Sequence, residues 1–356
     1  MLRSTDETLA VRAELAVHGV ALDAPVRRSK GAGPSDDGHV VVDGQNATFP
    51  LNPASRYAVR DGKVYDGTID LGLTIEPVDR PKFYELSTAD GVPYSKIALL
   101  HGKDVLASTV VQTCIRYGEA QRCRFCSIEE SLRAGSTVPV KTPAQLAEVA
   151  EAAVRLDGVR QLVLTTGTTA GPDRGARHLI RCVKAVLAAV PGLPIQVQIE
   201  PPKDLTVLAD LHAAGATSIG IHVESLDDAV RTRWMPGKAT VPLAEYWHAW
   251  DTAVAVFGRN RVSTYLLIGL GEDPEELIAG AAELIAHGVY PFAVPMRPTQ
   301  GTLARRDGAT APSPALVGMV TGRIAELLRD AGMTGADQRA GCAACGACGL
   351  LSAAGG

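Results

Sequence analysis

Apolar runs typical of buried strands alternate with segments of helical hydrophobic spacing along the middle of this chain. Such a rhythm predicts parallel βα units and an α/β fold. The expected strands cover residues 105–112, 161–166, 195–200, 218–224, 262–270 and 290–296. The expected helices cover residues 142–156, 177–190, 205–214, 243–257, 274–287 and 315–331. Because a closed barrel has eight units, six predict a partial (β/α)6 TIM-like barrel.

The N-terminal part of the chain lacks this rhythm. A helical segment near 7–18 and short alternating runs at 39–42 and 68–75 predict a small α+β cap over residues 1–95. The barrel core then takes residues 96–332, and a Cys-rich C-terminal tail takes residues 333–356.

Two of the expected strands place polar residues at every second position, namely Gln196, Gln198 and Glu200 in one and Gly220, His222 and Glu224 in the other. Since helices cover the outer face of a barrel with apolar contacts, we expect these residues to point into the lumen. A polar lumen indicates an open barrel that holds a ligand. The alternative is that one of these strands lies at a sheet edge and faces solvent.

Composition narrows the classes of function. Hydrophobic residues make up 46% and charged residues 21% of the chain, which is typical of a globular protein with a large core. The formal net charge of −4 provides no positive field for nucleic acid or anionic lipid, so neither partner is expected. The start is acidic and no apolar run reaches the ~18 residues of a membrane span, which favours a cytoplasmic protein.

Six of the seven cysteines fall into two clusters, and Cys182 stands alone. In a chain without an export signal this clustering favours metal or iron–sulfur ligation over disulfides. The first cluster follows the first barrel strand, where catalytic loops of such barrels lie. Three thiolates can hold a 4Fe-4S cluster with one open iron, or zinc with an open water position. The clusters are Cys114, Cys123 and Cys126, and Cys342, Cys345 and Cys348.

The first cluster, with Phe125 just before its last cysteine and six βα units around it, resembles the radical S-adenosylmethionine (radical SAM) superfamily. The overall layout is similar to that of biotin synthase. Eight residues separate Cys114 from Cys123, where the usual pattern has three. The strings 222–226 and 235–238, together with the Cys-rich tail, look similar to a subfamily encoded near bacterial nitrilases.

This resemblance implies an oxygen-sensitive enzyme. Its 4Fe-4S cluster would reductively cleave S-adenosylmethionine to a 5′-deoxyadenosyl radical that abstracts hydrogen from a small polar substrate. The electron would come from a donor such as flavodoxin or ferredoxin. The resemblance also implies cofactor-binding positions after the second strand, at two strand ends and after the fifth strand: Thr166, Gly167, Thr168, Glu200, Glu224, Gly269 and Gly271. No catalytic residue beyond the cluster ligands is expected.

The tail has the spacing Cys-x2-Cys-x2-Cys, with small residues between the thiols. Short spacings of this kind are frequent in ferredoxin-type loops, so the tail predicts a second, auxiliary iron–sulfur cluster. A zinc site and a disordered tail with reactive thiols are the alternatives.

Two other classes compete with a radical enzyme. A zinc-dependent barrel hydrolase would use the same thiols, but His222 is the only histidine on the six expected barrel strands. A non-enzymatic iron–sulfur electron carrier has no need of a barrel with a polar interior. If the protein is a radical enzyme, its residues do not distinguish between rearrangement, dehydrogenation, cyclisation and group insertion.

Overall fold

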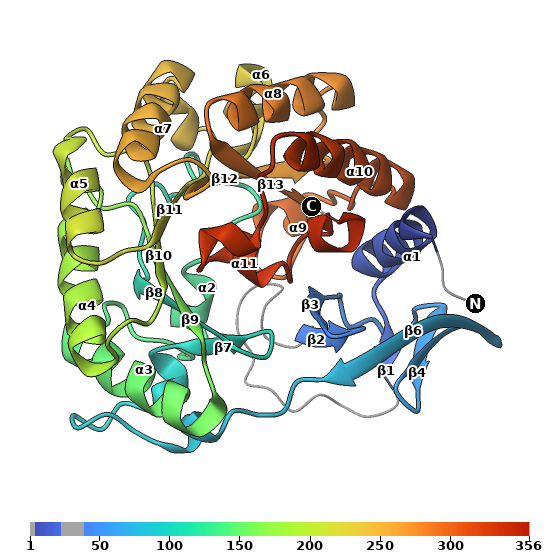
Figure 1. The fold of residues 1–356 in the computed structure, drawn as a ribbon, viewed down its shortest axis with the longest axis horizontal. Coiled ribbons are helices and arrows are strands. Elements are labelled where there is room, and N and C mark those ends of the chain that lie inside the picture. Colours follow the sequence, from blue (N-terminus) through green and yellow to red (C-terminus); the bar gives the residue numbers. More distant parts are fainter. Residues whose placement is uncertain (1–3, 23–38, 356) are drawn as a thin grey trace.

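The computed structural model describes residues 4–22 and 39–355, which form two sheets and their surrounding helices (Figure 1). The larger sheet has seven strands in the order β13-β12-β11-β10-β9-β8-β7, all parallel except the β7–β8 hairpin. The strands are β7 Leu99–His101, β8 Val105–Val111, β9 Gln161–Thr166, β10 Ile195–Ile199, β11 Ser218–Ile221, β12 Val262–Ile268 and β13 Val289–Pro295.

Helices follow the parallel strands and cover the outer face of the curved sheet (Figure 1). The fold is therefore the partial TIM-like barrel that the sequence predicts, with an antiparallel edge strand added. Its outer helices are α3 Pro143–Asp157, α4 Ala176–Ala189, α5 Thr206–Ala213, α7 Leu243–Phe257, α8 Pro274–Ala286 and α10 Pro314–Asp330. Short helices on its loops are α2 Glu130–Arg133, α6 Asp228–Trp234 and α9 Leu303–Arg306.

Local sequence sets the ends of these helices. Helix α3 begins with a capping box, in which Thr142 and Gln145 satisfy each other's backbone N–H groups, and Pro143 occupies its first position. It ends at Gly158, which has a left-handed backbone conformation (φ 66°). At the start of α8, the Asp273 side chain accepts a hydrogen bond from Glu275 N–H, and Pro274 occupies the first helical position.

Strands β10 and β11 lie in the middle of the large sheet, so the edge-strand alternative is wrong. Gln196 is fully buried and Gln198 is 6% exposed, and the two side chains hydrogen-bond to each other at 2.9 Å. Gln198 also accepts a hydrogen bond from Thr165 Oγ1 on β9 at 2.8 Å. The interior of the barrel is thus polar and paired.

The N-terminal residues form helix α1 and a second sheet with the order β1-β4-β5-β6-β2-β3 (Figure 1). Helix α1 packs against α10, which joins this part to the barrel. The predicted α+β character is confirmed for the described residues of 1–95, whereas the domain boundaries remain a prediction. The elements are α1 Thr5–His18, β1 Ala21–Leu22, β2 His39–Val42, β3 Gln45–Thr48, β4 Tyr57–Arg60, β5 Lys63–Asp66 and β6 Ile69–Pro77.

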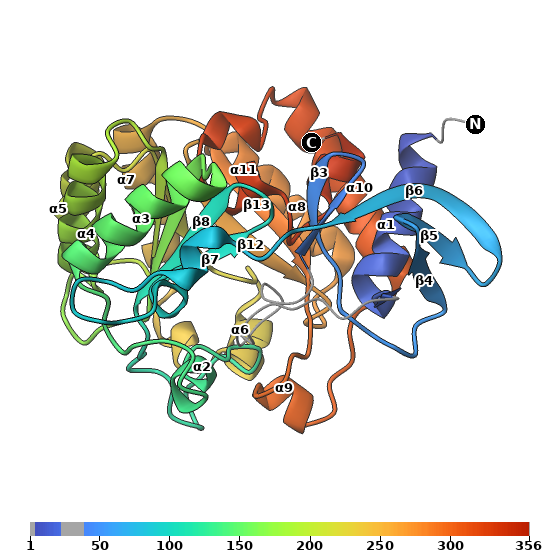
Figure 2. The ribbon, with the colours of Figure 1, turned by 90° about the horizontal axis from the view of Figure 1, so that it is seen from below.

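The Cys-rich tail folds against the N-terminal ends of the barrel strands. Gly341 N–H donates to Gln161 Oε1 at 2.8 Å, and Ser218 Oγ donates to the Ala340 carbonyl at 3.0 Å. Helix α11 (Cys342–Cys345) lies at one end of the barrel, opposite α2, α6 and α9 (Figure 2). A disordered tail, one of the sequence-based alternatives, is therefore wrong.

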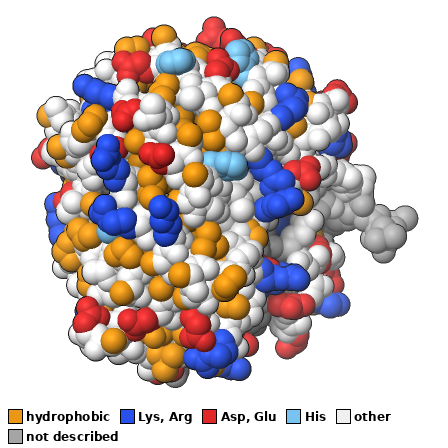
Figure 3. Space-filling view, turned by 60° about the vertical axis from the view of Figure 1, so that its left-hand side comes forward, with side chains coloured by type: hydrophobic (Ala, Val, Ile, Leu, Met, Phe, Trp, Pro, Cys, Tyr) orange, Lys and Arg blue, Asp and Glu red, His pale blue; other side chains and the backbone are white. Residues whose placement is uncertain are grey.

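The face that carries α4 and α5 shows acidic and basic side chains interspersed, with no continuous basic patch (Figure 3). Among the described residues, no helix combines the length and apolarity that crossing a bilayer requires.

Candidate functional site

The loop between β8 and α2 holds Cys114, Cys123 and Cys126 at the C-terminal end of the barrel. Two tight turns shape it: Tyr117 N–H donates to the Cys114 carbonyl, and Cys126 N–H donates to the Cys123 carbonyl, both at 3.0 Å. All three cysteines are unpaired and partly accessible. Catalytic loops of α/β barrels lie at this end of the strands, as the sequence predicts.

One ion pair fixes the loop to the barrel. Arg116 donates from Nε to Glu200 Oε2 at 3.0 Å and from Nη2 to Glu200 Oε1 at 2.5 Å. Thr168 Oγ1 donates to the same carboxylate at 2.9 Å. Glu200 and Thr168, both predicted cofactor-binding residues, therefore lie together beside the cysteine loop, and each uses its side chain in protein contacts.

A second buried ion pair lies below the loop. Glu224 Oε1 is 3.0 Å from Lys238 Nζ, and both side chains are 13% exposed. Glu224 has a φ of 71°, a strained conformation for a residue with a side chain. Backbone hydrogen bonds to Tyr265 and Leu267 of β12 hold it there. Burial lowers the pKa of Lys238, but the adjacent Glu224 carboxylate, Tyr246 and Cys123 together raise it more, so the pKa lies above its ordinary value.

The thiols of the loop influence one another electrostatically. Burial, with a smaller contribution from Cys114, raises the pKa of Cys126 to about 11. Burial also raises the pKa of Cys123, while nearby Lys238 lowers it. Thiolates this close repel one another unless a cation lies among them. The donor set therefore fits an iron–sulfur cluster, although no three His, Cys, Asp or Glu side chains in the described part of the chain already converge on one metal position.

The other predicted cofactor-binding residues occupy two loops, one after β9 and one after β12. Thr166 ends β9, and a Cβ on Gly167 would lie 2.1 Å from the Thr113 carbonyl oxygen, so only glycine lets the loop after β9 meet the cysteine loop. Beyond β12, Gly269 and Gly271 both have positive φ. Gly269 packs against Pro312, and Gly271 lies beside Arg233. The loops that follow β9 and β12 are thus tightly packed at these glycines.

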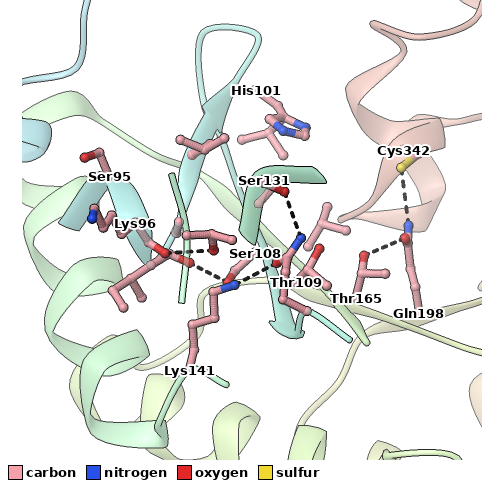
Figure 4. Close-up of a pocket in the computed structure, with 18 of the residues that line it drawn as sticks. Ser95, Lys96, His101, Ser108, Thr109, Ser131, Lys141, Thr165, Gln198 and Cys342 are labelled. Carbon is pink, nitrogen blue, oxygen red and sulfur yellow. Dashed lines mark hydrogen bonds between the residues drawn. The ribbon is translucent and has the colours of Figure 1, made fainter. Parts of the chain in front are cut away.

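At the other end of the lumen, all three tail cysteines line one cavity of about 270 Å³ (Figure 4). Cys342 Sγ is 3.3 Å from Gln198 Nε2. Burial raises the pKa of Cys342 to about 11, and burial raises the pKa values of Cys345 and Cys348 as well. Three soft donors facing one space suit an iron–sulfur cluster or zinc.

Tyr265 and His222 lie between the two cysteine clusters. The rings contact edge to face with centroids 4.4 Å apart, and Tyr265 N–H donates to His222 Nδ1 at 3.2 Å. Burial lowers the pKa of His222 to about 3, so the imidazole is neutral. Tyr265 lies against Cys342 at the tail end and is influenced by Glu224 at the loop end. One aromatic residue therefore spans the distance between the two regions.

Sequence reasoning missed Arg116 and Lys238, which pair with the two predicted glutamates. Arg116 lies two residues after Cys114, so its position in the loop is a signal that could have been used. The Lys238 pairing has a weaker signal, because Lys238 is 14 residues from Glu224 on a separate loop. Each predicted glutamate is thus already neutralised by a cation from the chain itself.

Comparison with protein families gives one match: residues 117–284 fit the model of the radical SAM superfamily. The match includes Cys123 and Cys126, but Cys114 and the tail cysteines lie outside it.

Several curated proteins share part of this chain. Bacteriochlorophyllide c C-7(1)-hydroxylase from Chlorobaculum limnaeum is 26% identical over 60% of this chain and 57% of its own length. Mitochondrial lipoyl synthase from Leishmania braziliensis is 29% identical over 53% of this chain and 48% of its own, and lipoyl synthase from Laribacter hongkongensis is 30% identical over 48% and 51%. The chain thus spans about half the length of the curated relatives it matches.

Two solved structures are similar in part. Methylornithine synthase (PylB) aligns with a TM-score of 0.48 at 17% identity, over 64% of this chain and 62% of its own. The FeFe-hydrogenase maturase HydG from Carboxydothermus hydrogenoformans aligns with a TM-score of 0.48 at 19% identity, over 65% and 52%.

Proposed function

Because this chain belongs to the radical SAM superfamily, we propose that Cys114, Cys123 and Cys126 hold a 4Fe-4S cluster at the C-terminal end of the barrel. When bound, such a cluster supplies the electron that cleaves S-adenosylmethionine to a 5′-deoxyadenosyl radical, which abstracts hydrogen from the substrate. The substrate is small and polar and occupies the lumen. The observation that carries this proposal is the set of three thiols on one loop beside a polar, paired barrel interior.

The protein's own contribution to this chemistry is positioning. The Arg116–Glu200 pair holds the cysteine loop against the end of β10, so the thiols approach a cluster from a fixed direction. Burial raises the pKa of the Cys123 thiol, and nearby Lys238 lowers it, which favours the thiolate form, although its partner Glu224 acts in the opposite direction. Thiolate is the form that ligates metal. The Arg116–Glu200 pair and Lys238 thus reduce the cost of assembling a negatively charged ligand set.

The remaining predicted cofactor-binding residues suit close backbone approach. Gly167 leaves no room for a side chain, and Thr166 and Thr168 flank it with hydroxyl groups. At the end of β12, Gly269 and Gly271 likewise have no room for a side chain, because Pro312 and Arg233 lie against them. We assign these residues, together with Glu200 and Glu224, to the S-adenosylmethionine site, where backbone groups and hydroxyls contact the polar parts of the cofactor.

The tail cysteines Cys342, Cys345 and Cys348 are proposed to hold the second iron–sulfur cluster. Their support is that all three thiols line one cavity and that the Gln198 amide lies against Cys342. Arg297, a buried guanidinium, lowers the pKa of Cys348 and so favours its thiolate, although burial raises that pKa more. A fourth ligand from substrate or solvent would complete the set.

A reducing compartment suits this arrangement. All seven cysteines are unpaired, and oxidation of either set would remove its ligands. We therefore propose a cytoplasmic, oxygen-sensitive enzyme supplied with electrons by a flavodoxin or ferredoxin. The zinc hydrolase and the electron carrier are disfavoured by the superfamily match and by the polar lumen, respectively.

The test is anaerobic reconstitution of the full chain with iron and sulfide, followed by iron counting and an EPR spectrum of the reduced protein with and without S-adenosylmethionine. About eight irons per chain, with an EPR signal that S-adenosylmethionine changes, support both clusters. About four irons with the same change support the catalytic cluster alone. Tightly bound zinc with no cluster would overturn the proposal in favour of a hydrolase.

A further inference from the structure

The cavity that the tail cysteines line has a second wall with different chemistry. This wall comes from the β7–β8 hairpin and from the segment that follows the cysteine loop, and it carries the hydroxyl groups of Ser108, Ser131 and Thr137. Lys141 lies on the same wall, and Figure 4 shows it across the cavity from Cys342. The cavity is thus bounded by thiols on one side and by hydroxyls and an ammonium group on the other.

Lys141 is held firmly in this position. Its backbone N–H donates to the Val110 carbonyl at 2.9 Å, directly after the bridge between Val111 and Val140. Its own carbonyl accepts a hydrogen bond from His178 Nε2 at 2.9 Å, and the next residue caps helix α3. Backbone contacts on both sides therefore fix the point from which the side chain reaches into the cavity.

The ammonium group of Lys141 lacks an anionic partner in the described part of the chain. Lys141 is 2% exposed, and its ammonium group contacts the neutral amide of Gln112, where Nζ donates to Oε1 at 2.8 Å. Burial without a compensating charge lowers the pKa of Lys141 to about 7. A buried lysine in this condition destabilises the fold, so its presence calls for a functional reason.

Apart from the tail thiols, the cavity supplies no group that could carry a negative charge. Among the described residues that line it, none is Asp or Glu, while Lys96, His39 and His101 add basic groups to the lining. An anionic group entering from solvent would find an ammonium donor with hydrogens to spare and neighbouring hydroxyls. It would also meet no carboxylate to repel it.

We infer that Lys141 binds a carboxylate of the substrate, so that the proposed radical enzyme acts on a small carboxylic acid whose charged end lies at this wall of the cavity. This inference rests on the proposed function, because it takes the cavity as the substrate site. A single ammonium balances a monoanionic carboxylate, whereas a dianionic phosphate would keep an unbalanced charge inside the protein. The cavity has a volume of about 270 Å³ and must also take the proposed second cluster on the tail cysteines, so only a small acid fits beside it.

The experiment measures binding to the anaerobically reconstituted full chain with three matched compounds: butanoate, its neutral analogue butanamide, and methyl phosphate. Acetic anhydride at neutral pH acetylates lysines in their neutral form, and mass spectrometry of the peptides gives the rate at each lysine. We expect butanoate at about ten times its Kd to slow acetylation of Lys141 about tenfold and to leave exposed Lys184 unchanged. Butanamide should slow the acetylation of neither lysine.

Substitution gives a second readout that does not depend on labelling. The thermal stabilisation that butanoate confers on the wild type should be lost in Lys141→Met and retained in Lys184→Met. Equal protection by butanoate and butanamide, or a Lys141→Met variant that still binds butanoate, would overturn the inference. Stronger protection by methyl phosphate would overturn the choice of a carboxylate. None of these measurements requires cleavage of S-adenosylmethionine, so failure here is distinct from failure of the proposed radical function.

Discussion

Arg116 and Glu200 face each other in a two-point ion pair that links residues 84 positions apart, the cysteine loop and the end of β10. The two side chains are only 12% and 4% exposed. Two parallel N–H···O contacts define both the position and the plane of the guanidinium group. The geometry of the thiol ligands therefore depends on a residue that lies in a different βα unit.

Replacing Glu200 with Gln should loosen the cysteine loop. The variant leaves the Arg116 guanidinium buried without a charged partner, which typically costs about 3–5 kcal/mol. We expect urea unfolding to show a loss of this order and reconstitution to give a lower iron content. The matched control is Glu151→Gln, which breaks the exposed pair with Arg155 and should change stability by no more than ~0.5 kcal/mol. Equal losses in both variants would contradict a special role for the Arg116–Glu200 pair.

Iron counting on single cysteine variants separates the two thiol sets. If each set holds one 4Fe-4S cluster, Cys126→Ala and Cys345→Ala should each lose about four irons from a total of about eight. Cys182→Ala is the control, because Cys182 is fully buried in the hydrophobic core, and it should keep all the iron. A full iron content in Cys126→Ala would refute the assignment of the catalytic cluster.

Gly341→Ala should release the tail from the barrel. Gly341 has a φ of 108°, and an added Cβ would lie about 2.1 Å from the side-chain amide of Gln196. Gln196 is fully buried and hydrogen-bonded to Gln198, so its amide has no free space to enter. We expect a loss of about 1–3 kcal/mol from overpacking, added to about 1 kcal/mol for the backbone conformation, and faster tryptic cleavage after Arg339.

Gly192→Ala provides the comparison for that variant. Gly192 also has a positive φ, 79°, but an added Cβ there meets nothing within 4 Å. This variant should show the backbone cost alone and no change in proteolysis of the tail. If the two variants behave alike, close packing between Gly341 and Gln196 does not hold the tail.

Lys141 should make stability depend on pH. Its pKa is about 7 in the folded protein, against 10.5 when solvated, so the folded state loses the proton first. The destabilisation is complete below pH 7 and decreases as pH rises from 7 to 10.5, with a slope of at most about 1.4 kcal/mol per pH unit. Urea unfolding of Lys141→Met should lack this rise and should show higher stability at pH 7. Lys184→Met should retain the wild-type dependence, and a rise of equal size in Lys141→Met would contradict the prediction.

Much of the barrel could be predicted from the sequence, because the signals for its strands and helix ends lie within short segments of the chain. The runs 161–166 and 262–270 are apolar enough to identify buried strands, and Thr142 and Pro143 mark a helix start within two residues. The polar alternation of Gln196 and Gln198 predicts the character of the lumen in the same way.

The position of the tail could not be predicted, because it depends on long-range pairing. Gly341 contacts Gln161, 180 residues earlier, and nothing in either segment specifies the other. Lys141 was missed for a related reason, since a lysine between Val140 and the cap residue Thr142 gives the pattern of an exposed turn. Its burial results from the hairpin and loop that fold over it from other parts of the chain.

The docking of the tail on the strand N-termini also has a consequence for biosynthesis. Residues 334–355 leave the ribosome after every strand of the barrel, so that end of the lumen stays open during translation and closes a few seconds later at about 5–20 residues per second. If the tail thiols hold the proposed second cluster, iron and sulfide can reach the site in two ways: directly in an unfinished barrel, or later through the cavity of the folded one.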